Sequence, residues 1–88
     1  MPRLLIRMNM FTASQMAYVI NFQGEVQKTF TLSVDKLDRE VLRICEDEKI
    51  QDIIISGPMI YTRRFMKKIA EAELVKYNQS KYNIRLIK

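Results

Sequence analysis

The feature that most constrains the fold is a change in the spacing of apolar side chains along the chain. From Arg3 to Phe11 apolar residues recur at every second position, which is the period of a β-strand. Two further alternating runs cover 16–22 and 26–32, and Gly24 between them predicts a hairpin turn. The first third of the chain is therefore expected to form three strands in an antiparallel meander.

After Ser33 the apolar residues change to helical spacing. Ser33 stands where an N-cap residue is preferred, and Asp35 lies in the first turn, where the helix dipole favours an anion. The helical pattern continues to about Lys49. These signals predict a first helix directly after the meander.

The stretch after this helix predicts a strand, a joint and a second helix. Residues 52–56 are a short aliphatic run, and Gly57-Pro58 follows it. A phosphate-binding loop needs several glycines and then a lysine and a hydroxyl at fixed spacing, whereas this stretch has one glycine and a proline that lacks an N–H. We therefore expect an ordinary joint, in which Gly57 or Ser56 caps a helix that starts at Pro58 and continues to about Tyr77, and a last strand over 82–87.

The predicted order is βββαβαβ within a single domain, residues 1–88. Three antiparallel strands followed by two helix–strand units resemble, at the level of topology, the ribonuclease H-like core over nearly the whole chain. The resemblance implies a five-stranded mixed sheet with the strand order 3-2-1-4-5. Because right-handed crossovers that step toward one edge place both helices on one face, the expected fold class is α/β, a two-layer sandwich with one uncovered face.

The sequence offers few groups for catalysis. In nuclease members of the ribonuclease H-like group, carboxylates on the first strand and at the end of the fourth hold two magnesium ions. Here the first strand carries Arg7 and Asn9, and Ser56 ends the fourth. The chain has no histidine, and its one cysteine, Cys45, falls in the helical pattern. We expect no enzyme activity, no metal, no cofactor and no small-molecule substrate.

Charge and composition bear on partners and location. The net charge of +5 favours anionic partners. A lone cysteine fits a reducing compartment, and the longest aliphatic run, 53–55, is too short to cross a membrane. The protein is therefore expected to be cytoplasmic and to make no membrane contact.

The first candidate surface is the uncovered face of the sheet. The alternation predicts that Tyr18, Ile20 and Phe22 point toward the core, which leaves Phe11 as the one aromatic of the right phase for the uncovered face. On that face we expect an apolar row with a polar rim: the row is Leu5, Val19, Ile54 and Ile87, and the rim is Arg7, Arg85, Asn9 and Asn21. Such a row indicates an interface, a few aliphatic side chains that are simply exposed, or side chains covered by a surface loop.

The second candidate surface is the outward side of the second helix. Its cations, predicted to contact nucleic acid or another anion, are Arg63, Arg64, Lys67 and Lys68. Ile60, Leu74 and Val75 lie on the same side, which favours contact with a protein partner or a second copy. A solvated helix face is the remaining interpretation.

These patterns predict a small, non-catalytic binding or regulatory module. It is expected to act through protein contact or self-association, as a phage- or plasmid-encoded inhibitor would. The alternative is a nucleic-acid-binding protein that uses the four cations of the second helix.

Overall fold

The elements of secondary structure follow the predicted order. The structure is a computed structural model that describes residues 2–9, 11 and 14–87. Its elements are β1 (Arg3–Arg7), β2 (Ser14–Ile20), β3 (Val26–Ser33), a short 3-10 helix (Val34–Lys36), α1 (Leu37–Glu48), β4 (Asp52–Ser56), α2 (Met59–Tyr77) and β5 (Asn83–Ile87). The first strand ends at Arg7, earlier than predicted. Met10, inside that predicted strand, and Thr12 and Ala13 after it lie outside the described residues.

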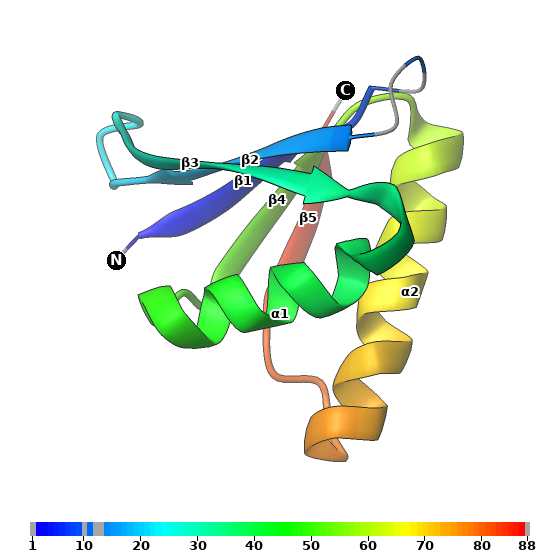
Figure 1. Ribbon diagram of the computed structural model, residues 1–88. Coiled ribbons are helices and arrows are strands. Elements are labelled where there is room, and N and C mark those ends of the chain that lie inside the picture. The colour runs from blue at the N-terminus through cyan, green and yellow to red at the C-terminus, as the bar shows by residue number, and fades with distance from the viewer. Residues whose placement is uncertain (1, 10, 12–13, 88) are drawn as a thin grey trace.

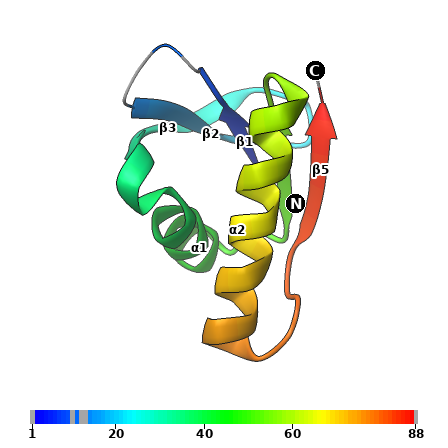
Figure 2. The same cartoon turned by 90° about the vertical axis from the view of Figure 1, so that its right-hand side faces the viewer.

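The sheet has the predicted strand order, β3-β2-β1-β4-β5. β1 pairs antiparallel with β2 and parallel with β4, while β2–β3 is antiparallel and β4–β5 is parallel. Both helices lie on one side of the twisted sheet (Figure 1), and the view turned by 90° shows the same arrangement (Figure 2). The α/β fold with a five-stranded mixed sheet and two helices is thus confirmed.

The core lies between the sheet and the two helices. Leu4 and Ile6 of β1 are fully buried, whereas Leu5 between them is only partly buried. The same alternation holds in β4, where Ile53 and Ile55 are buried. The helices contribute Leu37, Val41, Leu42, Ile44, Cys45, Phe65 and Ile69 to the same cluster. One face of the sheet is therefore packed against apolar helix surfaces.

The prediction for the second strand was wrong in phase. Val19 is 4% exposed and belongs to the core cluster, while Tyr18 points to the opposite face. The register explains this result, because Val19 lies opposite Leu4 and directly paired residues share a face. Ile20 is buried but lies outside the core cluster, and Phe22 is exposed. Since nearly every side chain of β2 is apolar, its sequence pattern had no polar side to fix the phase.

The joint between β4 and α2 is tightly built. The backbone N–H of Met8 donates to Ser56 O at 2.8 Å, and the N–H of Gly57 donates to Ile87 O at 3.3 Å. Gly57 has φ 147°, and a Cβ there would stand 3.0 Å from the carbonyl oxygen of Met8. Pro58 is the N-cap of α2 and not its first helical residue, so the helix begins one residue later than predicted. The ordinary joint accounts for the Gly-Pro pair.

The start of the first helix differs from the prediction. Ser33 precedes the 3-10 helix and makes no side-chain capping hydrogen bond. The α-helix itself begins at Leu37 and is followed by Lys49 in the left-handed conformation, close to the predicted end. β3 is therefore joined to α1 by a 3-10 turn and not by a capped α-helical turn.

A buried carboxylate fixes the connection from α2 to β5. Glu73 is 1% exposed, and its Oε2 accepts hydrogen bonds from the backbone N–H groups of Lys81 and of Tyr82, the latter at 3.1 Å. Hydrogen bonds to a charged acceptor are stronger than neutral ones. Glu73 thereby holds the residues that lead directly into β5.

We expect Glu73→Ala to lower the free energy of unfolding by about 2 kcal/mol, because it leaves backbone donors without their acceptor in a buried position. The measurement is urea unfolding followed by circular dichroism. The control is Glu71→Ala, at an exposed position of the same helix. Equal effects of the two substitutions would contradict the assigned role of Glu73.

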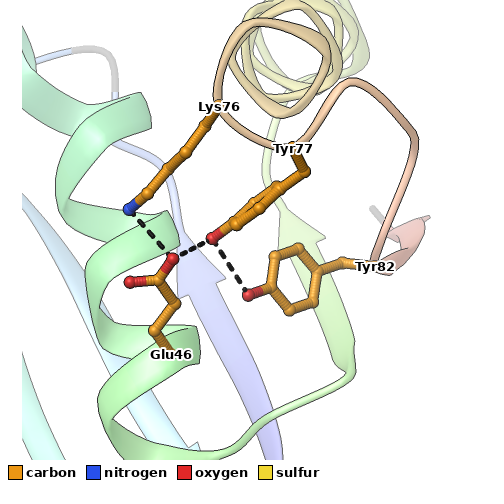
Figure 3. Close-up of polar contacts among 4 residues, drawn as sticks. All are labelled: Glu46, Lys76, Tyr77 and Tyr82. Carbon is orange, nitrogen blue, oxygen red and sulfur yellow. Dashed lines mark hydrogen bonds and ion pairs between the residues drawn. The ribbon is translucent and has the colours of Figure 1, made fainter.

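A polar cluster joins the last turns of α1 and α2 to Tyr82, the residue just before β5 (Figure 3). Glu46 Oε1 accepts a hydrogen bond from Tyr77 Oη and pairs with Lys76 Nζ at 2.9 Å, and Tyr77 Oη lies 3.4 Å from Tyr82 Oη. The pKa of Glu46 is lowered from 4.5 because Tyr77 and then Lys76 donate to its carboxylate. The pKa of Tyr77 is raised from 10.0, first by burial and next by the bond to Glu46. Neutral Tyr77 and ionised Glu46 thus stabilise each other across the two helices.

We expect Tyr77→Phe to lower the melting temperature most between about pH 5 and about pH 10. The contribution of Glu46, whose pKa is depressed, is present above pH 4.5 and is lost as pH falls through its folded-state pKa. The contribution of Tyr77, whose pKa is raised, is present below pH 10.0 and is lost as pH rises beyond it. Thermal unfolding of both proteins across this pH range measures the effect, and a difference that stays constant with pH would refute it.

Candidate functional site

The best candidate site is the face of the sheet turned away from the helices, which we call the open face. In the described chain no helix covers it (Figure 1). The alternation and register place the following side chains on it: Arg3, Leu5, Arg7, Met16, Tyr18, Ile20, Thr29, Thr31, Asp52, Ile54, Ser56, Asn83, Arg85 and Ile87. All five strands therefore contribute to this surface.

An apolar row crosses the middle of the open face. Tyr18 lies opposite Leu5, and Leu5 lies opposite Ile54, on three adjacent strands. At about 4.8 Å between strands, these three positions span about 10 Å, which is close to the width of one helix. The row continues to Thr29 on one edge strand and to Arg85 on the other. Of the predicted row, Leu5 and Ile54 are neighbours here, Tyr18 takes the place expected for Val19, and Ile87 lies beside Ser56 instead of Ile54.

Arginines surround this row. Arg3 and Arg7 stand at the two ends of β1, on either side of Leu5 and about 13 Å apart at 3.3 Å per residue. Arg85 lies beside Ile54 in the next strand. Of the described side chains on the open face, one is acidic: Asp52, whose Oδ1 accepts a hydrogen bond from Asn83 Nδ2 at 3.2 Å. The open face therefore combines an apolar centre with a positive rim.

A hollow of about 620 Å³ adjoins the open face where β1 ends and β2 begins. Arg7, Phe11, Met16 and Tyr18 are among its lining residues, and Phe11 is 87% exposed. The buried side chain of Gln15 fixes one wall, because its Oε1 accepts the Asn9 N–H and its Nε2 donates to Asn9 O at 2.8 Å. A polar residue at a core position is thus satisfied by the backbone that shapes the hollow.

The four cations of α2 are exposed, but they divide into two pairs. Arg64 and Lys68 line a groove together with Asp35, Asp38, Arg39 and Glu71, so acidic side chains accompany them. Arg63 and Lys67 line a separate hollow beside Tyr82 and Leu86 of the β5 segment. Charges that point to different sides of one helix do not form a single phosphate-tracking row.

The apolar residues predicted on α2 are also exposed and also separate. Ile60, Leu74 and Val75 are 62%, 55% and 89% exposed. Ile60 lies about 21 Å along the helix axis from Leu74, at 1.5 Å per residue. Arg64, Lys67, Lys68 and Glu71 lie between them in sequence. These residues therefore do not build one apolar patch.

Three further features bear on the chemistry of the chain: its cysteine, its possible metal ligands and the hydrophobicity of its helices. Cys45 is buried, and burial, with Glu73 and Glu46 next, raises the pKa of its thiol to about 12. Among the described residues no three His, Cys, Asp or Glu side chains gather to hold a metal ion. Over the same residues, neither helix is long and apolar enough to cross a membrane.

The structure thus distributes the predicted interface residues over three places. Leu5, Arg7, Ile54 and Arg85 share the open face, Val19 belongs to the core, and Ile60, Leu74 and Val75 lie on α2. Sequence reasoning missed Arg3, Met16 and Tyr18. The pairing of Leu4 with Val19 is the signal that assigns Tyr18 and Met16 to the open face, and this pairing becomes visible only in the register.

No protein-family model, curated protein or solved structure matches the chain. The topological resemblance to the ribonuclease H-like core therefore stays a prediction, and functional inference depends on the geometry of the chain itself.

We expect Gln15→Ala to accelerate hydrogen exchange of the Asn9 amide about fivefold, because the N–H loses an acceptor worth on the order of 1 kcal/mol. Exchange measured by nuclear magnetic resonance tests this. The control is the Asn21 amide, which donates to Glu25 O at 3.0 Å in the hairpin turn between β2 and β3. An equal acceleration at Asn21 would show global destabilisation and would contradict a local role for Gln15.

Proposed function

We propose that this chain is a small, non-catalytic binding module that acts on a partner protein through its open face. The observation that carries the proposal is the row of Tyr18, Leu5 and Ile54 across three strands that no described helix covers. A contiguous apolar patch with a polar rim is typical of a protein interface. A module of this kind regulates its partner by occupying it.

The composition of the open face supports a protein as the partner. Tyrosine, methionine and arginine are enriched in protein interfaces, whereas lysine and glutamate are depleted. Among its described side chains, the open face has Tyr18, Met16 and arginines, and it has no lysine or glutamate. The outward side of α2 also exposes Arg63 and Arg64, but it adds the depleted types lysine and glutamate at Lys67, Lys68 and Glu71. The open face is therefore the better candidate for partner contact.

Nucleic-acid binding by α2 stays a prediction for which the geometry adds no support. Arg64 and Lys68 share their groove with acidic residues, and Arg63 and Lys67 point to another side of the helix. A protein that follows a phosphate backbone needs cations along one continuous path.

The test is affinity capture from cells that express the protein, with Leu5→Thr and Ile54→Thr combined in one variant. Threonine suits a strand, so the variant should keep its fold while it loses the apolar contact. We expect the amount of captured partner to fall at least about tenfold, as when central interface residues are truncated. Circular dichroism of the purified variant checks that the fold is kept.

The matched control is Ile60→Thr combined with Val75→Thr, which removes two exposed apolar side chains from α2 instead. Capture by this control should equal that of the unaltered protein. Capture that is lost in the α2 variant and kept in the open-face variant would overturn the proposal.

A further inference from the structure

We propose that the partner protein presents carboxylates around an apolar patch, and that these carboxylates meet Arg3, Arg7 and Arg85. This inference rests on the proposed function and adds the chemistry of the partner. The rim of the open face has three arginines and one acid, Asp52, which already accepts a hydrogen bond from Asn83. Anions of a partner opposite this rim would form charge pairs with the arginines, whereas cations there would be repelled.

The type and placement of the cations support carboxylates as their partners. A guanidinium group forms two parallel hydrogen bonds with one carboxylate, and it loses less hydration than an ammonium group when it is buried in an interface. Arg3 and Arg7 flank Leu5 along β1, while Arg85 lies beside Ile54. Charged pairs around an apolar centre give orientation and speed of association, while the centre supplies most of the affinity.

The hollow beside Arg7 adds a second contact of the same kind. Phe11, Met16 and Tyr18 give it apolar walls, and Arg7 stands at its border with the open face. A large apolar side chain of the partner would pack against these walls, and a carboxylate next to it would pair with Arg7. The expected partner segment is therefore acidic and carries apolar or aromatic residues.

A second copy of the chain fits the open face poorly. In a two-fold symmetric pair the same patch is used on both sides. Two open faces in contact would gather the rim arginines of both copies in one interface, with Asp52 of each copy as the described acid. Like charges placed together in an interface are destabilising.

A single-stranded nucleic acid fits it less well than an acidic protein. Sheets that bind single strands stack successive bases on several aromatic rings. On the described strands of the open face, Tyr18 is the one aromatic side chain, and its neighbours in the central row are the aliphatic Leu5 and Ile54. An aliphatic centre favours apolar side chains of a protein.

The test is selection of a displayed library of random peptides on the purified chain. We expect the enriched peptides to contain an excess of aspartate and glutamate together with apolar residues. Binding of a selected peptide should weaken at least about tenfold in a variant with Arg3→Gln, Arg7→Gln and Arg85→Gln, and it should weaken as salt is raised. Thermal unfolding of the variant confirms that the fold is kept.

The matched control is a variant with Arg63→Gln, Arg64→Gln and Lys67→Gln, which removes the same charge from α2 and should bind the peptide as the unaltered chain does. Neutral or basic selected peptides, or equal losses in both variants, would overturn the inference. Tighter binding of oligothymidylate than of any selected peptide would assign the open face to nucleic acid and overturn the inference. A dimer in sedimentation that Leu5→Thr with Ile54→Thr dissociates would assign it to a second copy and also overturn the inference.

The same selection separates the two proposals. If Leu5→Thr with Ile54→Thr abolishes peptide binding while the arginine variant and salt have no effect, the open face is the binding surface and the carboxylate inference is wrong. If neither open-face variant weakens binding, the proposed function fails as well.

Discussion

The structure depends on the burial of one side of the central strand β1 against both helices. Leu4 and Ile6 are fully buried, and the register passes their orientation to the flanking strands β2 and β4. Because both crossovers place their helices on one side, every side chain of opposite phase stays on the uncovered side. The packing that makes the core therefore also determines which residues lie on the open face.

The order of elements and strands was predictable because each element has its own local signal. The alternation in β1, the aliphatic run of β4 and the turn at Gly24 each indicate one structure, and the structure confirms them. The phase of β2 was not predictable, because both of its sides carry apolar residues and because Gln15, its most polar inward residue, is hydrogen-bonded to the backbone of Asn9. A buried residue of this kind depends on tertiary contacts that no periodicity records.

The residues of the candidate site divide in the same way, into those that the sequence predicts and those that only the structure reveals. Arg7 and Arg85 mark the outward side of β1 and β5, and Leu5 and Ile54 were correctly placed beside them, although the isoleucine run of β4 has no polar residue at its centre. Tyr18 was assigned to the wrong face, and this error hid the aromatic end of the apolar row. The cations of α2 appear as one cluster in the sequence, yet the neighbouring acidic residues of the α1 segment become visible only in three dimensions.

The central claim is that the partly exposed Tyr18 and Met16 lie on the open face while Val19 faces the core. Hydroxyl-radical footprinting with tandem mass spectrometry, which compares the folded chain with the chain in urea at each residue, tests it most directly. The account predicts strong protection of the buried Val19 and Leu4 on folding and weaker protection of the partly buried Tyr18 and Met16. Strong protection of Tyr18 together with ready oxidation of Val19 would contradict the account.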